Sequence, residues 1–135
     1  MAGRDVLART WHDQARADLS AAEDSTSTGH HEWACFQAQQ AGEKALKAFL
    51  YAHGRTSVIT HSLRRLAREA AAIDAAFAGL DEAARLLDQH YIPTRYPNGL
   101  DTETAPAAYY EERDAEQCLR SARLILARVS TSFAS

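Results

Sequence analysis

The stretch that decides the fold is residues 31–53, which read HEWACFQAQQAGEKALKAFLYAH. At 100° per residue, a helix over this stretch has two occupied faces. One face is small and apolar and carries Cys35, Ala38, Gly42, Ala45, Leu46 and Phe49. The other mixes aromatic, amide and basic side chains, namely Trp33, Phe36, Gln40, Lys44, Lys47 and Tyr51. Such a helix is normally covered on both sides, so we expect it at the centre of a bundle or shared with a second subunit, and we favour the second subunit.

Helical patterns continue on both sides of this stretch. Residues 5–24 predict a helix whose inner stripe is Leu7, Trp11, Ala15, Leu19 and Ala22, followed by a loop at Ser25–Gly29. Gly54 is placed to end the central helix, and Thr60 or Ser62 to cap the next one. That next helix has Leu63, Leu66, Ala70 and Ile73 on its inner face, and further helices are predicted over 80–92 and, as the longest of all, over 107–133.

The composition supports one all-helical domain. The chain has 135 residues with only 6 Gly and 3 Pro and is rich in alanine, which favours helix over strand. We therefore predict an all-α, up-and-down bundle of four to five helices that spans residues 1–135 as a single domain. A net charge of −3 argues against wrapping duplex DNA. No stretch is long and apolar enough for a membrane span or a secretory signal, so we expect a cytoplasmic protein.

The two cysteines give no sign of a metal centre. Cys35 and Cys118 lie far apart and match no metal-ligand or redox spacing. We interpret both as small core residues and expect no metal and no cofactor.

Asp18 falls inside the apolar stripe of the first predicted helix. A buried carboxylate needs a partner, and Lys44 or Lys47 is the natural candidate. The alternative is that Asp18 lies at the edge of the stripe and its carboxylate reaches water.

The basic residues concentrate around the start of the helix that follows residue 62. They are Arg55, Arg64, Arg65 and Arg68, together with His53 and His61. Free backbone amides at a helix start favour an anion, so phosphate is the predicted ligand. The alternative is a solvated helix face that binds nothing.

The segment Tyr91–Pro97 places Arg95 between Tyr91 and Tyr96 on a turn that prolines stiffen. This composition suits stacking on a base and holding a phosphate. It suits equally well a turn that is locked against the helix beneath it.

Taken together, these patterns resemble the HEPN domain family. The resemblance runs in order through most of the chain and rests on Trp11, Ala15, Asp18, Leu19 and Ala22, then Phe36, Gln39-Gln40-Ala41 and Glu43–Ala48, then His61-Ser62-Leu63 and Leu66, and finally Tyr91 and Arg95-Tyr96-Pro97. It implies a helical bundle, usually a homodimer, in a family associated with nucleotide and RNA chemistry. It also implies a minimal nucleotidyltransferase as partner in a two-gene toxin–antitoxin system.

One branch of that family cleaves RNA with an Arg, four to six residues and then a His. The candidate catalytic residues here are Arg85 and His90, and Arg55 and His61 show a similar spacing. Chance alone accounts for such matches in a chain this rich in arginine. In a straight helix Arg85 and His90 would also point about 140° apart.

We therefore interpret the chain as a nucleotide- or RNA-associated binding module rather than an enzyme. The expected ligand-binding residues are Lys44, Lys47, His61, Arg64, Tyr91, Arg95 and Tyr96. A metal-independent ribonuclease that uses an Arg and a His at a dimer cleft is the first alternative. A structural adaptor without any ligand is the second.

Overall fold

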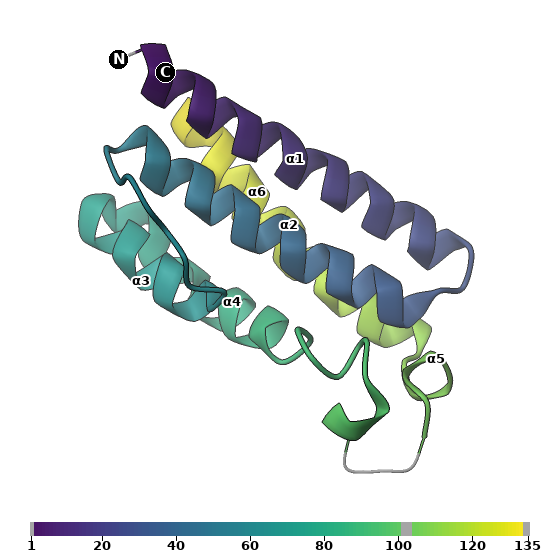
Figure 1. The fold of residues 1–135 in the computed structure, drawn as a ribbon. Helices are drawn as coiled ribbons and strands as arrows, with labels where there is room; N and C mark the ends of the chain where they lie inside the picture. The colour runs from purple at the N-terminus through teal and green to yellow at the C-terminus, as the bar shows by residue number, and fades with distance from the viewer. Residues whose placement is uncertain (1, 101–103, 134–135) are drawn as a thin grey trace.

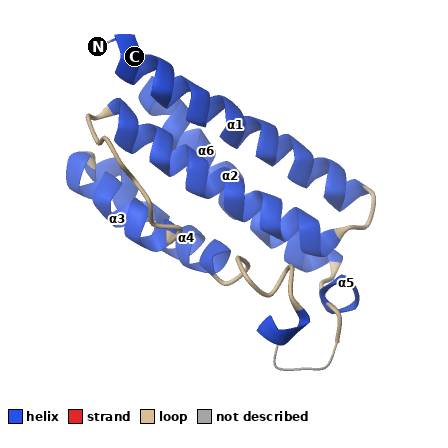
Figure 2. Cartoon of the chain, viewed as in Figure 1, coloured by secondary structure: helices blue, strands red, loops and turns tan. Residues whose placement is uncertain are grey.

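A computed structural model describes residues 2–100 and 104–133. These residues form six α-helices and two 3-10 segments and contain no strand (Figure 2). The α-helices are α1 (Ala2–Ser27), α2 (His31–Ala52), α3 (Leu63–Ile73), α4 (Asp81–Asp88), α5 (Pro106–Tyr109) and α6 (Glu112–Phe133), and the 3-10 segments are Ala75–Leu80 and Pro97–Gly99. This confirms the predicted all-α bundle. Within the described ranges, no helix is long and apolar enough to cross a membrane.

Helix α2 lies at the centre, as its two occupied faces predict (Figure 1). A Cβ atom added at Gly42 would lie 2.7 Å from Leu63, 3.2 Å from Leu87 and 3.4 Å from Ile125. The missing side chain therefore lets α3, α4 and α6 approach α2 at one level of the bundle.

The lysine-bearing face of α2 is covered mainly by α1 of the same chain. The Trp11 ring lies 5.6 Å from that of Tyr51, and the Lys47 ammonium lies 5.6 Å from the Trp11 ring centroid. Toward the start of α2, Trp33 remains 45 % exposed. A neighbouring segment, rather than a second subunit, thus closes most of this face.

The connection between α2 and α3 turns back along α2, so the two helices run in the same direction (Figure 1). Leu63 at the start of α3 lies against the middle of α2 at Gly42. Phe77, which follows α3, lies near the end of α2, with its ring centroid 4.2 Å from that of Phe49. Gly54 adopts φ +91° to end α2, and the Ser62 hydroxyl accepts a hydrogen bond from the Arg65 amide, as predicted.

Two expectations for α1 are wrong. The Ser/Thr cluster continues the helix to Ser27, because the hydroxyls bond back to carbonyls within the helix, as Thr26 does to Ala22 at 2.9 Å. Leu7 is 40 % exposed and Ala8 is buried in its place, whereas Ala15 and Ala22 are fully buried as predicted. Small residues at this spacing allow α1 to lie close against α2.

The later helices also depart from the predicted bounds. Helix α4 ends at Asp88 rather than Ile92, and Ile73 at the end of α3 is exposed rather than buried. The predicted helix over 107–133 is broken at Tyr110, whose backbone is extended. The break follows from capping, because the Asp114 carboxylate accepts a hydrogen bond from the Glu111 amide at 2.8 Å and starts α6 afresh. The longest helix is therefore α1.

Candidate functional site

A buried ionic group lies on α2 where it meets the α2–α3 connection. The Glu43 carboxylate lies 3.0 Å from Lys47 Nζ and 3.1 Å from His61 Nδ1. The Glu43 and Lys47 side chains are each only 5 % exposed, whereas His61 is 58 % exposed. The buried Glu43 carboxylate is thus a partner for the exposed imidazole of His61.

His61 leads into a group of stacked side chains that we call the Arg95 cluster, made of Phe36, His61, Tyr91, Arg95 and Tyr96. The rings of His61 and Tyr91 stack at 5.3 Å with an interplanar angle of 17°. The Arg95 guanidinium lies 4.4 Å from the Phe36 ring, 4.7 Å from Tyr91 and 5.3 Å from Tyr96. The structure thereby brings four of the seven expected ligand residues into one cluster.

Arg95 also locks its own turn. Its Nε and Nη2 donate hydrogen bonds to the Tyr91 carbonyl at 3.0 and 2.8 Å. A guanidinium has five N–H donors, so three make no hydrogen bond within the described residues. Arg95 is thus fixed in place and keeps donors for a ligand.

Lys44 pairs with Asp18 at 2.6 Å, which confirms the predicted partnership between α1 and α2. The two side chains are 24 % and 17 % exposed, so the pair lies partly within the α1–α2 interface. Both lysines of α2 are therefore already bound to carboxylates.

Arg64 lies apart from the Arg95 cluster. Its Nε donates to Asp81 at 3.1 Å. The expectation of free amides at the start of α3 is also wrong, because the Asp88 carboxylate accepts from the amides of Leu63 at 2.7 Å and Arg64 at 3.1 Å. A carboxylate from the end of α4 thus fills the position that we expected phosphate to take.

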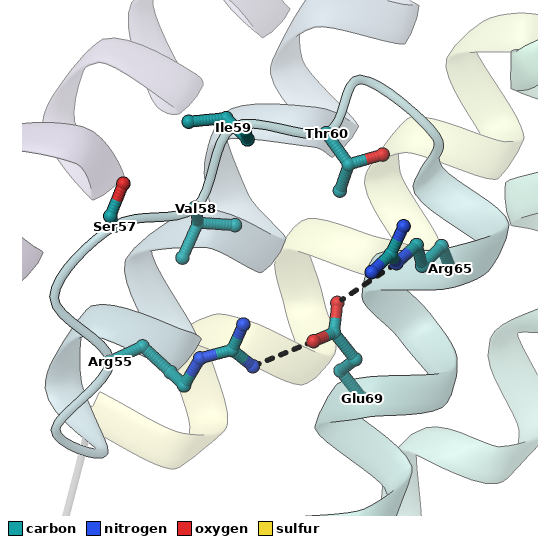
Figure 3. A pocket seen from close by; sticks show the side chains of 7 residues that line it. All are labelled: Arg55, Ser57, Val58, Ile59, Thr60, Arg65 and Glu69. Carbon is teal, nitrogen blue, oxygen red and sulfur yellow. Dashed lines mark hydrogen bonds and ion pairs between the residues drawn. The ribbon is translucent and has the colours of Figure 1, made fainter.

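The other arginines around the start of α3 are paired as well. Arg55 and Arg65 both approach Glu69, at 2.7 and 3.9 Å, and line a cavity of about 430 Å³ together with Ser57, Val58, Ile59 and Thr60 (Figure 3). Arg68 lies 3.8 Å from Asp81, which it shares with Arg64. Two carboxylates are therefore shared among four arginines and offset only two of the four positive charges, and no member of the Arg95 cluster lines this cavity.

The two catalytic candidates do not form a pair. His90 is half-buried, and its Nδ1 lies 3.0 Å from the Tyr110 hydroxyl. Arg85 is exposed on α4 and makes no described hydrogen bond or ion pair with His90. Burial lowers the pKa of His90, an effect that the Asp114 carboxylate partly opposes.

Three residues that lie far apart in the sequence are close together in the structure, beside Tyr110. They are Cys35, His90 and Cys118, whose potential ligand atoms all lie within 4.8 Å of one another. A hydrogen bond with the Cys35 thiol and burial raise the pKa of the Cys118 thiol, and burial raises the pKa of the Tyr110 hydroxyl. The residues come from three separate segments, so no local motif could have revealed them.

Sequence reasoning also missed the role of Glu43, for which only its spacing of four residues from Lys47 was a signal.

Comparison with known proteins identifies the family of the chain. The HEPN domain model matches residues 8–132. A Methanocaldococcus jannaschii protein named as a candidate toxin is 29 % identical over 126 residues, which cover 88 % of this chain and 83 % of that protein.

Two solved structures are also similar. The structure of TT1696 from Thermus thermophilus has a TM-score of 0.79 and 40 % identity, and covers 92 % of this chain and 96 % of its own. That of ST0689, an archaeal HEPN homologue, has a TM-score of 0.76 and 37 % identity, with 93 % and 96 % covered. The chain therefore belongs to the HEPN domain family.

Proposed function

We propose that this protein is a nucleotide- or RNA-binding HEPN module that works with a minimal nucleotidyltransferase in a toxin–antitoxin-type pair. The observation that carries the proposal is the Arg95 cluster, in which a fixed guanidinium and exposed rings share one surface. Membership of the HEPN family and the name of the M. jannaschii relative support the toxin–antitoxin setting.

The chemistry of the cluster suits a base joined to a phosphate. Tyr96 is 49 % exposed and the His61 side chain 58 %, so each offers a ring to an unpaired base. The three remaining donors of Arg95 suit a phosphate oxygen. We assign direct contact to His61, Arg95 and Tyr96, and a positioning role to Tyr91 and Lys47.

Lys44 and Arg64 have a smaller part in this proposal. Lys44 is already paired with Asp18, and Arg64 with Asp81, which lies on α4. We expect Lys44 to hold α1 against α2 and Arg64 to hold α3 against α4.

A ribonuclease is less well supported by the geometry. A general acid or base must reach its substrate, but His90 is half-buried and bonded to Tyr110. Arg85 is not placed to act with it within one chain. We therefore keep RNA cleavage as an outcome to be measured rather than as the proposal.

Titration calorimetry with ATP, GTP and a short single-stranded RNA tests the proposal. We expect the wild type to bind at least one of them, and the double variant Arg95→Ala, His61→Ala to bind it about tenfold more weakly or worse, a loss of about 1.4 kcal/mol. Arg120→Ala is the matched control, because Arg120 is an exposed arginine beside a different cavity, next to Leu124 and Leu86.

Two results would overturn the proposal. One is unchanged binding by a double variant whose circular dichroism matches the wild type. The other is a wild type that binds a nucleotidyltransferase but no nucleotide or RNA, which would favour the structural adaptor. RNA cleavage that disappears in His90→Ala would favour the nuclease instead.

A further inference from the structure

Two buried thiols and an imidazole converge at the junction of three segments. Cys35 comes from α2, Cys118 from α6, and His90 from the turn that follows α4. Both cysteines are fully buried, and the candidate ligand atoms lie within 4.8 Å of one another. Among the described residues, this is the one such group of three.

The donor set and the spacing suit a zinc ion after a small contraction. Zinc takes sulfur ligands at about 2.3 Å and imidazole nitrogen at about 2.0–2.1 Å, so tetrahedral ligands lie roughly 3.5–3.8 Å apart. Atoms that lie at most 4.8 Å apart must therefore approach one another by at most about 1.3 Å to reach these separations.

Charge favours a divalent ion. Two thiolates and a neutral imidazole carry a charge of −2, which Zn²⁺ cancels and Cu⁺ leaves half uncompensated. An uncompensated charge is costly in a buried site. Both cysteines are fully buried, so the neutral zinc complex is the better fit.

A neighbouring hydroxyl already orients the imidazole. The bond of 3.0 Å between the Tyr110 hydroxyl and His90 Nδ1 fixes the ring beside the two sulfurs. Metal-bound histidines generally have such a partner for one ring nitrogen. Three protein ligands would leave a fourth tetrahedral position for a small molecule such as water.

We propose that Cys35, His90 and Cys118 bind one Zn²⁺ ion, which joins α2 and α6 to the turn after α4. This turn continues into Tyr91 and Arg95, so the ion would anchor the segment that carries the Arg95 cluster. The proposal does not depend on nucleotide binding, because its test measures metal directly.

The test uses the whole protein, purified under reducing conditions and without an affinity tag. After addition of Zn²⁺ and removal of excess by dialysis, we expect one zinc per chain by plasma mass spectrometry. Replacement with Co²⁺ should give the charge-transfer and ligand-field absorption bands of a tetrahedral site with two thiolates. Cys35→Ser, Cys118→Ser and His90→Gln should each lower zinc retention about tenfold or more.

Two further measurements keep the test decisive if a serine variant fails to fold. His90→Gln changes a residue outside the fully buried core, and the cobalt spectrum of the wild type needs no variant at all. His53→Gln is the matched control, since His53 bonds the Phe49 carbonyl outside the cluster and its loss should leave zinc retention unchanged.

Several results would overturn the proposal. They are less than one-tenth of a zinc per chain after loading, cobalt bands that lack thiolate charge transfer, or equal zinc retention by His90→Gln and the wild type. A Cys35–Cys118 disulfide that persists in reducing buffer would also overturn it, because oxidised sulfurs cannot serve as thiolate ligands.

Discussion

His12 is a residue whose titration should affect stability. Its Nε2 lies 3.1 Å from the Ser130 hydroxyl, and its ring lies 4.9 Å from Phe133, so it joins α1 to the end of α6. Burial lowers the pKa of His12, nearby Arg16 lowers it further, and Asp13 partly offsets both. The folded protein therefore favours the neutral imidazole.

The sign of the pH effect follows from linkage. As pH falls through 6.5, the ordinary pKa of a histidine, the unfolded chain takes up the proton before the folded chain does. The contribution of His12 to stability is thus complete above this pH and declines below it. Denaturant unfolding at about pH 7.5 and about pH 5 should show a smaller loss on acidification in His12→Gln than in the wild type. Equal losses, or an NMR titration midpoint of His12 above 6.5, would contradict the assignment.

Single residues also show which parts of the site can be predicted from the sequence. The sequence predicts a lysine of α2 as the partner of Asp18, because an acid inside an apolar stripe needs a countercharge, and Asp18 pairs with Lys44. The partner of Lys47 is not predictable in this way, because Glu43 lies on the same helix and meets His61 only when the connection to α3 turns back along α2. Periodicity identifies faces of a helix, but the path of a loop across a face has no such signal.

At the scale of the element, Gly42 determines how closely α2 can be approached. A side chain at this position would collide with Leu63, at 2.7 Å from the added Cβ, and crowd Leu87 and Ile125. Forcing extra atoms into a packed core costs about 1–3 kcal/mol or more, against about 1 kcal/mol gained from replacing glycine within a helix. A leucine should reach the upper end of this cost, because its Cβ alone would already lie 2.7 Å from Leu63, so we expect Gly42→Leu to lower the free energy of unfolding by about 2 kcal/mol.

Chemical denaturation followed by circular dichroism measures this effect. Gly79→Leu is the control, because no atom lies within 4 Å of a Cβ at that position. If Gly42→Leu were as stable as Gly79→Leu, the close approach of three helices at Gly42 would be wrong.

The end of a helix can be predicted when the capping residue is a neighbour in the sequence, but not when the capping residue comes from a distant segment. Gly54 and Ser62 are local signals, and both act as expected. The start of α3 is also held by Asp88, which lies 25 residues away from the Leu63 amide that it caps. No residue near Leu63 in the sequence indicates this contact. The sequence therefore predicts an anion site at these amides, and this prediction is wrong because the Asp88 carboxylate occupies them.

At the scale of the whole molecule, the class of fold follows from the sequence but the arrangement of the site does not. Alanine-rich stripes with a period near 3.6 residues predict packed helices. The meeting of His61 with Tyr91, and of Cys35 with His90 and Cys118, depends on a connection that turns back along α2 and on the break before α6. These are tertiary outcomes, and the chain carries no repeat or motif that encodes them locally.

The exposed aromatic residue Trp33, near the start of α2, predicts self-association of the whole molecule. Trp33 is 45 % exposed, and its ring lies 6.1 Å from that of Phe36, which itself contacts Arg95. Large aromatic side chains are enriched at the centres of protein interfaces. We therefore expect a homodimer in which a second copy covers Trp33 and borders the Arg95 cluster.

Sedimentation equilibrium should give twice the 14.9 kDa mass of one chain for the wild type. It should give the monomer mass for Trp33→Glu, because burying an unpaired carboxylate in the interface is costly. Leu124→Glu, which changes a residue of α6 that is 47 % exposed, should remain dimeric. A monomeric wild type, or a Trp33→Glu variant that still dimerises, would place any interface elsewhere. If nucleotide binding is also lost with the dimer while the fold is retained, the second copy completes the Arg95 cluster as well as covering Trp33.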